Sequence, residues 1–169
     1  MKNILYLHGL ESNQGGSKID FLSSKYTVHA PKLDYKDPIC FNNIFGLIEG
    51  GDFDLIIGSS MGGYLALTMG EIFKLPTILF NPALHSRSFE PVNPYKPNLG
   101  NTVHNVILGD EDNIIDYNKT CEYLNLNDIQ YIKEVIPGMG HRTPLNIFMN
   151  EVYGRILQLD KLSNIITKF

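Results

Sequence analysis

Short apolar runs alternate with longer stretches in which apolar residues return at every third or fourth position. The short runs hold four to seven residues and are rich in β-branched side chains, which is typical of strands buried inside a sheet. The longer stretches have the spacing of helices with one buried face. The six predicted strands are 3–7, 26–30, 54–57, 77–80, 102–108 and 131–136. The predicted helices are about 17–25, 38–50, the stretch directly after Ser60, 113–125 and 144–167, with Gly154 as a candidate break in the last one.

This alternation predicts an α/β fold, a compact, doubly wound, mostly parallel sheet of six strands with helices on both faces. We expect the strand order 2-1-3-4-5-6, with the switch point between the first and third strands. In that order the loop after the first strand, at His8 and Gly9, lies beside the loop after the third. Neither a linker nor an internal repeat divides the chain, so residues 1–169 are expected to form a single domain.

Residues 83–101 interrupt the alternation. Pro91, Pro94, Pro97 and Gly100 stand among few apolar residues, which predicts a loop rather than a further domain. The segment follows a predicted strand, and in parallel sheets the loops at the carboxyl ends of the strands form the ligand site. We therefore expect this segment to be the cover of the site, in place of a large lid.

The most informative stretch joins the third strand to its helix. Gly58-Ser59-Ser60-Met61-Gly62 matches the pattern Gly-x-Ser-x-Gly. A chain that turns from a strand directly into a helix strains the middle residue, and the flanking positions then have no room for a Cβ. Ser60 is raised at the carboxyl end of the sheet, over a helix N-terminus that favours developing negative charge. The pattern also occurs as a simple glycine-rich turn, but its place between strand and helix predicts that Ser60 is a nucleophile.

A serine nucleophile needs a base within hydrogen-bonding reach and a carboxylate that orients the base. His141 directly follows the sixth predicted strand and is the candidate base. The candidate acids follow the fifth strand, where Asp110, Glu111 and Asp112 stand together. We predict Asp112, because Asp110 comes too early in the turn and is expected to bond to that turn's own backbone. The chain order Ser60, Asp112, His141 is that of α/β-hydrolases.

Simpler interpretations of these polar residues also exist. A surface histidine is usually only solvated, and an acidic turn can be solvated or can cap the next helix. Asp116 is expected to lie inside that helix and to face away from the sheet edge. No second ligand cluster or calcium-loop spacing supports a metal site, so neither a metal nor an organic cofactor is expected. His8 is expected to brace its loop by hydrogen bonding rather than to accept protons.

Acyl transfer also requires two N–H donors for the negative oxygen of the tetrahedral intermediate. One is expected from the backbone of Met61, the residue after the nucleophile. The other is expected from the loop after the first strand, at Leu10 or, as the second choice, Glu11. A backbone donor does not depend on its side chain, so the sequence leaves this second position open.

Composition narrows the setting of this chemistry. The net charge of −4 and the pI near 5.7 offer no basic surface for nucleic acid. Cys40 and Cys121 have neither metal-ligand spacing nor the density of a disulfide framework, so a reduced cytoplasmic setting is expected. The first apolar run is too brief for a signal peptide, and no run approaches the roughly 18 apolar residues of a membrane span.

Several blocks of the chain together carry a family resemblance. They are Tyr6-Leu7-His8-Gly9 with Ser12, Ser17 and Lys18, then residues 58–66, Asn81-Pro82-Ala83 and residues 109–117. These blocks span nearly the whole chain and resemble the small α/β-hydrolase esterases of the YqiA type. The resemblance implies a minimal α/β-hydrolase fold without a large lid, triad positions at Ser60, Asp112 and His141, and a preference for short acyl esters and thioesters. The chain departs from that family in a shorter segment after Ala83 and in Met139-Gly140-His141-Arg142 around the histidine.

The sequence therefore predicts a serine hydrolase that cleaves short-chain carboxylic esters or thioesters through an acyl-enzyme on Ser60. An acyltransferase would use the same residues, and a catalytically silent binding domain can share the fold. A nucleotide-binding module is disfavoured, because Gly9, Gly15 and Gly16 match neither Gly-x-Gly-x-x-Gly nor a P-loop. The expected partner is a small-molecule ester or thioester, and the pattern does not indicate an oligomeric state.

Overall fold

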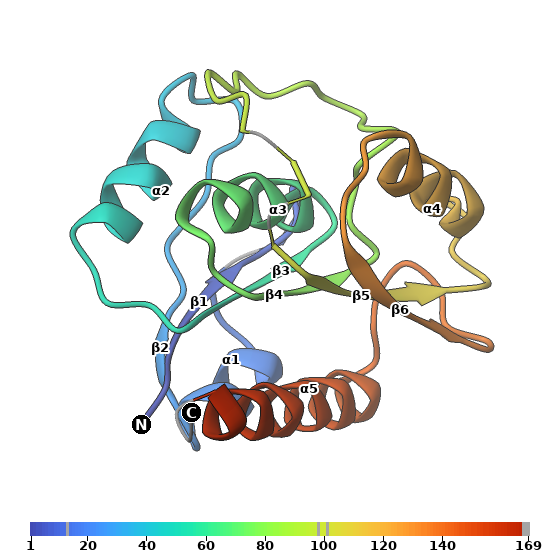
Figure 1. The fold of residues 1–169 in the computed structure, drawn as a ribbon. Helices are drawn as coiled ribbons and strands as arrows, with labels where there is room; N and C mark the ends of the chain where they lie inside the picture. Colours follow the sequence, from blue (N-terminus) through green and yellow to red (C-terminus); the bar gives the residue numbers. More distant parts are fainter. Residues whose placement is uncertain (13, 98, 101, 167–169) are drawn as a thin grey trace.

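The structure is a computed structural model that describes residues 1–12, 14–97, 99–100 and 102–166. Strands and helices alternate through the described chain, as the sequence pattern predicts (Figure 1). In chain order the elements are β1 (Asn3–Leu7), α1 (Ser17–Ser23), β2 (Thr27–His29), α2 (Cys40–Glu49), β3 (Leu55–Ser59), α3 (Met61–Phe73), β4 (Thr77–Phe80), β5 (His104–Gly109), α4 (Tyr117–Leu126), β6 (Tyr131–Ile136) and α5 (Leu145–Ile166).

The strands form one sheet in the order β2-β1-β3-β4-β5-β6, which confirms the predicted order. Every neighbouring pair is parallel, so the described sheet is parallel throughout. The register aligns the carboxyl ends of the strands: Leu7 lies opposite Gly58, and Ser59 lies opposite Phe80. The loops that follow these strands therefore leave the sheet at one edge.

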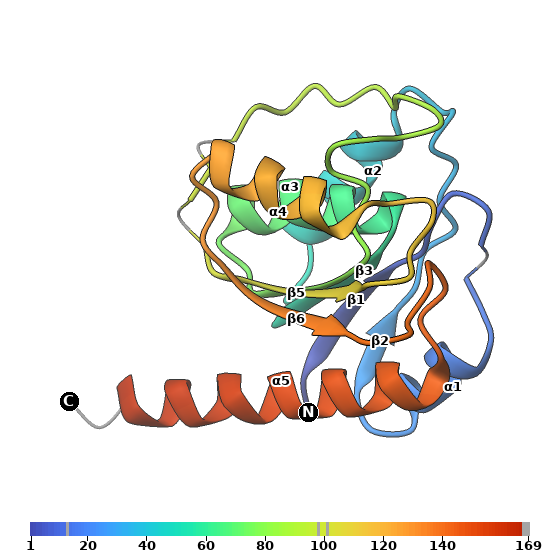
Figure 2. The same ribbon diagram turned by 90° about the vertical axis from the view of Figure 1, so that its right-hand side faces the viewer.

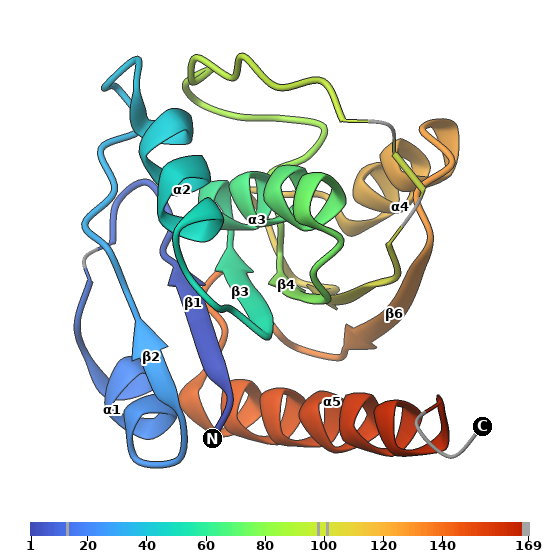
Figure 3. The same ribbon diagram turned by 60° about the vertical axis from the view of Figure 1, so that its left-hand side comes forward.

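Helices cover both faces of the sheet. Helices α2, α3 and α4 lie over one face, and α1 and α5 lie over the other (Figures 1 and 3). Alternate residues of β1 point to opposite faces of the sheet. Leu5 and Leu7 belong to the hydrophobic core under α2, α3 and α4, and Ile4 and Tyr6 belong to the core under α1 and α5. Strands covered on both faces need apolar side chains in both directions, which explains the uninterrupted apolar runs in the sequence.

Helix α5 runs without a break from Leu145 to Ile166 and extends beyond the sheet (Figure 2). The candidate break at Gly154 is therefore absent. One glycine costs a helix only about 1 kcal/mol, and Val152 and Ile156 on either side are buried against the sheet. The predicted end of this helix, residue 167, lies outside the described residues. No helix of the described chain combines the length and the apolar character needed to cross a membrane.

Helix α4 begins at Tyr117, later than the predicted start at residue 113. Asp116 is its N-cap, and the Asp116 carboxylate accepts hydrogen bonds from the backbone N–H groups of Asn118 and Lys119 at 2.8 and 3.3 Å. The expectation that Asp116 lies inside the helix is therefore wrong. A short polar side chain that accepts hydrogen bonds from the second and third residues of a helix marks the residue just before the helix. Helix α4 therefore begins directly after Asp116.

The described part of the segment 83–101 has no regular secondary structure, as predicted, and passes over α2 and α3 (Figure 3). Residues 98 and 101 of this segment are outside the description. The segment is attached to the helices below it: the ring of Tyr95 stacks on that of Phe45 with centroids 4.9 Å apart. The amide of Asn93 donates a hydrogen bond to the hydroxyl of Tyr64 at 2.9 Å.

Candidate active site

Ser60 stands at the junction of β3 and α3 with a backbone φ of 54° and ψ of −118°. A positive φ is strained for a residue with a side chain, and such strain persists only where the surroundings fix it. The N–H of Ser60 donates to the carbonyl of Phe80 at 3.0 Å. The carbonyl of Ser60 accepts from the N–H groups of Gly63, Tyr64 and Ala83 at 2.9, 3.2 and 3.0 Å. These bonds hold the turn between strand and helix in place.

The two glycines of the pattern permit close packing around this turn. A Cβ added at Gly58 would lie 2.7 Å from the Cβ of Ala66, and one added at Gly62 would lie 2.6 Å from the carbonyl oxygen of His8. Both distances are shorter than van der Waals contact allows. The glycines therefore let the start of α3 approach the ends of β1 and β3, which places Ser60 at the sheet edge.

The three predicted residues Ser60, His141 and Asp112 lie together at this edge. The Nε2 atom of His141 is 3.0 Å from the Ser60 hydroxyl oxygen, and its Nδ1 atom is 2.8 Å from a carboxylate oxygen of Asp112. With the proton on Nδ1, the imidazole donates to the carboxylate and Nε2 is free to accept the serine proton. The Asp112 side chain is fully buried and that of His141 is 17% exposed.

The second oxygen of the Asp112 carboxylate is also used. It accepts hydrogen bonds from the backbone N–H groups of Ile114 and Ile115, each at 2.9 Å. The carboxylate is therefore held by three donors, two of them backbone groups of the next turn. Its orientation toward His141 is fixed by the chain that carries it.

Asp110 has a different role from the one predicted. Its carboxylate accepts a hydrogen bond from the N–H of Gly138 at 2.7 Å, and Gly138 belongs to the loop between β6 and α5. The expectation of a bond to its own turn is wrong. Strands β5 and β6 pair as far as Gly109 and Ile136, so their two loops leave the sheet side by side and come within reach of each other. Asp110 thus ties down the loop that carries His141.

Asn81, directly after β4, is a positioning residue whose role sequence reasoning missed. Its amide nitrogen donates to the carbonyl oxygens of Gly140 and His141 at 3.1 and 3.0 Å, and its oxygen accepts from the N–H of Gly109 at 2.8 Å. The residue is 1% exposed and has a φ of 41°, a conformation that asparagine tolerates better than most residues. An Asn-Pro pair after a buried strand is the signal that could have found it.

A cavity of about 270 Å³ with both polar and apolar lining residues adjoins Ser60. Leu10 and Met61, the two expected donors for a negative oxygen, line it together with Ser60, whereas Glu11 is not part of its lining. His8, at the base of the Leu10 loop, donates from Nδ1 to the carbonyl of Gly9 at 2.8 Å and accepts at Nε2 from a backbone N–H at 3.2 Å. Both ring nitrogens are therefore engaged in bracing this loop.

Arg87 fixes the wall of the same cavity. One terminal nitrogen of its guanidinium donates to the carbonyls of Ala83 and Leu84, each at 2.8 Å, and the other nitrogens bond to the carboxylate of Glu90 at 2.8 and 3.0 Å. The guanidinium carbon lies 4.2 Å from the centroid of the Tyr64 ring. The first part of the segment 83–101 is thereby held on helix α3.

A separate buried polar cluster lies at the opposite edge of the sheet. His104 bonds through Nε2 to the carboxylate of Glu71 and through Nδ1 to the hydroxyl of Thr77, each at 2.8 Å. Burial lowers the pKa of His104, an effect that the hydrogen bond to Glu71 and its charge partly offset. Within the described chain, no group of three or more His, Cys, Asp or Glu side chains is arranged to hold a metal ion.

A parallel sheet with a Gly-x-Ser-x-Gly turn after β3, an acidic residue after β5 and a histidine after β6 is the arrangement of the α/β-hydrolase fold. The chain belongs to the uncharacterised protein family UPF0227, whose profile matches residues 3–105. UPF0227 proteins of Vibrio cholerae serotype O1 are 31% identical to it over 94 residues, and the match covers 48% of this chain and 51% of theirs. The chain thus spans about half the length of the curated relatives it matches.

Solved structures of similar fold cover nearly the whole chain. The α/β hydrolase MGS-MChE2, from a metagenome of lagoon sediments at Mar Chica, Morocco, superposes with a TM-score of 0.70 at 16% identity, over 96% of this chain and 92% of that one. Est1E from Butyrivibrio proteoclasticus with bound ferulic acid gives 0.68 at 15% identity, over 94% and 89%. SOBER1 of Arabidopsis thaliana gives 0.61 at 16% identity, over 87% and 93%. At these identities the similarity establishes the fold alone.

Proposed function

We propose that this chain is a serine hydrolase that cleaves short-chain carboxylic esters or thioesters through an acyl-enzyme formed on Ser60. The observation that carries the proposal is the continuous series of hydrogen bonds from the Ser60 hydroxyl through His141 to Asp112, with distances of 3.0 and 2.8 Å. The α/β-hydrolase fold supports it but does not carry it, because one fold hosts many functions.

In the acylation step the Ser60 oxygen attacks the carbonyl carbon of the ester, and its proton passes to Nε2 of His141. The Asp112 carboxylate stabilises the resulting imidazolium ion. The carbonyl oxygen becomes negative and accepts hydrogen bonds from the backbone N–H groups of Met61 and Leu10. When the tetrahedral intermediate collapses, the bond to the alcohol or thiol breaks, and the leaving group takes the proton from Nε2.

Water then hydrolyses the acyl-enzyme by the same route. His141 accepts a proton from the water, the hydroxide attacks the acyl carbon, and Ser60 regains its proton when the carboxylic acid leaves. The cavity beside Ser60, with about 270 Å³ of space and Leu10, Met61 and Ile115 among its lining residues, suits a short acyl chain. Leu10 and Met61, whose backbones are the proposed N–H donors, belong to the lining of this cavity, which supports its use as the acyl site.

Covalent labelling tests the proposal directly. A fluorophosphonate probe should modify Ser60 in the native protein, and Ser60→Ala should abolish labelling and lower ester hydrolysis by several orders of magnitude while the protein stays folded. Ser59→Ala, one residue earlier in the chain, is the matched control and should cost far less. The proposal fails if Ser60→Ala hydrolyses esters at the native rate or if the label falls on Ser59.

A further inference from the structure

Arg87 stands out among the residues that line the cavity beside Ser60. Within the described chain it is the one lining residue that carries a charge, and its side chain is only 15% exposed. The guanidinium lies over the ring of Tyr64, with its central carbon 4.2 Å from the ring centroid. The same residue thus borders the cavity and covers a face of an aromatic ring on helix α3.

We propose that Arg87 limits the length of the acyl chain that the hydrolase accepts, because its guanidinium closes the cavity in front of the Tyr64 ring. The inference rests on the proposed hydrolase function and assigns to Arg87 the role of a residue that determines acyl specificity. An acyl chain attached to Ser60 would extend along the cavity until its end meets the guanidinium.

The guanidinium is held in place by several bonds. Its Nη1 atom donates to the carbonyl oxygens of Ala83 and Leu84, each at 2.8 Å, and its Nε and Nη2 atoms bond to the Glu90 carboxylate at 2.8 and 3.0 Å. A chain end that pushed the guanidinium aside would break bonds to two backbone carbonyls and to a carboxylate. Hydrogen bonds that involve a charged group are stronger than neutral ones. Arg87 is therefore a fixed stop and not a flexible gate.

The chemistry of the guanidinium also disfavours an alkyl chain that reaches it. A hydrocarbon end pressed against this group removes water from a charge and returns no hydrogen bond. Methylenes beyond the stop stay in water and contribute nothing to binding, since the hydrophobic gain follows the apolar area that is buried. The stop thus acts on long chains and leaves short ones alone.

The ring of Tyr64 would provide an apolar surface if the guanidinium were removed. Tyr64 lies one helical turn after Met61, which also lines the cavity. The Tyr64 hydroxyl accepts a hydrogen bond from Asn93 at 2.9 Å, and its ring packs against Phe41 with centroids 5.7 Å apart. Neither contact involves Arg87, so the ring keeps its support when that side chain is shortened.

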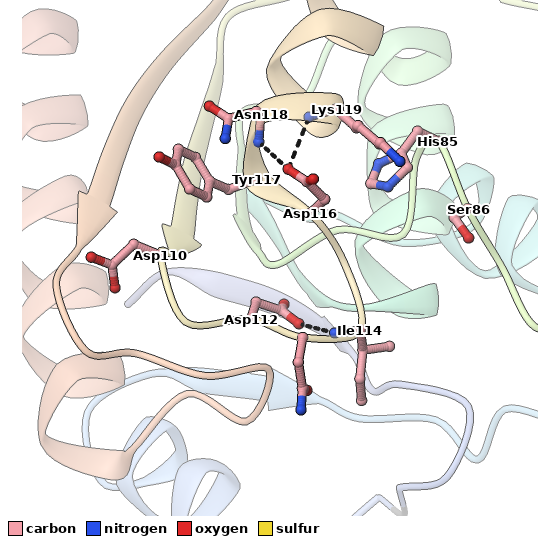
Figure 4. Close-up of a pocket in the computed structure, with 10 residues that line it drawn as sticks. His85, Ser86, Asp110, Asp112, Ile114, Asp116, Tyr117, Asn118 and Lys119 are labelled. Carbon is pink, nitrogen blue, oxygen red and sulfur yellow. Dashed lines mark hydrogen bonds between the residues drawn. The ribbon is translucent and has the colours of Figure 1, made fainter.

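Another part of the lining is fixed through the catalytic acid. Ile114 and Ile115 line the cavity, and their N–H groups donate to the Asp112 carboxylate, each at 2.9 Å. Figure 4 shows the bond from Ile114. A change at these positions would disturb the residue that orients His141. Shortening Arg87 enlarges the cavity without altering the hydrogen bonds of Asp112.

Esters with one leaving group and acyl chains of increasing length provide the test. We would measure kcat/KM for p-nitrophenyl butyrate, hexanoate and octanoate at concentrations where each ester is monomeric. Arg87→Ala should raise the ratio of octanoate to butyrate at least about tenfold, because each methylene newly buried against the Tyr64 ring raises kcat/KM about fourfold. Arg87→Gln should raise the ratio less, since its shorter side chain still fills part of the space and its amide can donate to a backbone carbonyl.

Glu90→Ala is the matched control. It removes the ion pair and one attachment of the segment, but it leaves the guanidinium bonded to Ala83 and Leu84 and in place over Tyr64. The ratio of octanoate to butyrate should therefore stay at its native value. This variant separates the effect of the guanidinium as a stop from the effect of loosening the loop.

The outcomes distinguish this inference from the hydrolase proposal. An unchanged ratio in folded Arg87→Ala and Arg87→Gln, an equal rise in Glu90→Ala, or a native preference for octanoate over butyrate would overturn the role of Arg87 while leaving the hydrolase intact. Failure to hydrolyse any of the esters, together with failure of the probe to label Ser60, would overturn both.

Discussion

Replacing Asn81 by alanine should damage catalysis without touching any group that contacts the substrate. The Asn81 amide connects the end of β4 to Gly109 at the end of β5 and to Gly140 and His141 in the loop after β6. Alanine removes all three hydrogen bonds at a position that is 1% exposed. The loop that carries His141 would lose its attachment to the centre of the sheet.

The expected magnitudes follow from these contacts. A typical hydrogen bond contributes about 1 kcal/mol net, so the loss of three costs about 3 kcal/mol. Alanine at a φ of 41° adds about 1 kcal/mol of backbone strain. The free energy of unfolding should fall by about 4 kcal/mol, within the usual reserve of about 5 to 15 kcal/mol for a domain. A displacement of His141 by about 1 Å should lower kcat by about 10².

Urea unfolding and steady-state kinetics on a butyrate ester would measure the two effects. Asn127→Ala is the matched control, because the Asn127 amide also bonds to a backbone carbonyl, that of Tyr123, but at the far end of α4. The control should lose about 1 kcal/mol of stability and keep its kcat. Native kcat in a folded Asn81→Ala protein would refute the positioning role that we assign to this amide.

Three further predictions address the acid, the acyl chain and the buried histidine. Asp112→Asn should lower kcat by up to about 10⁴, whereas Asp110→Asn, which only weakens the bond to Gly138, should cost much less; the reverse order in folded protein would show that Asp112 is the wrong acid. Butyrate esters should be hydrolysed with higher kcat/KM than esters of about twelve carbons, because a cavity of about 270 Å³ leaves much of a long chain unburied, and only buried methylenes each contribute about 0.8 kcal/mol; better turnover of the long esters would contradict this. Burial lowers the pKa of His104 from 6.5. Below pH 6.5 the His104 imidazole therefore binds a proton in the unfolded chain but not in the folded chain. As a result, the free energy of unfolding should decrease as the pH falls from about 7 to about 5.5. An NMR titration in which the His104 imidazole is protonated above pH 6.5 would contradict the sign of this effect.

The sheet and the three residues at its edge were accessible from sequence because their signals are local. Most strands contain a short apolar run, and Ser60, Asp112 and His141 stand one, three and five residues after the ends of β3, β5 and β6. Parallel connections then bring the carboxyl ends of the strands to one edge, so the residues that follow them must meet there. The predicted strand order is confirmed, and the His141 side chain lies within hydrogen-bonding distance of both Ser60 and Asp112.

The features that were not predicted depend on contacts between distant residues or on a choice between equivalent local signals. Asn81 bonds to backbone groups of residues 109, 140 and 141, and no short pattern reveals those distances. Asp110 bonds across to Gly138 because two neighbouring loops run side by side. Asp112 and Asp116 each accept hydrogen bonds from backbone N–H groups two and three residues later, so the local sequence does not reveal that α4 begins after Asp116.

The fixed segment beginning at Ala83 has a consequence for how substrates would reach Ser60. Hydrogen bonds from Arg87 and the contact with Tyr64 hold this segment on helix α3 through groups of the chain itself. Binding would then require no ordering of the cover, and its entropic cost would already have been met during folding. An enzyme of this kind would act on monomeric, dissolved substrate. Its rate would follow the monomer concentration and would not rise abruptly when the substrate begins to aggregate into droplets.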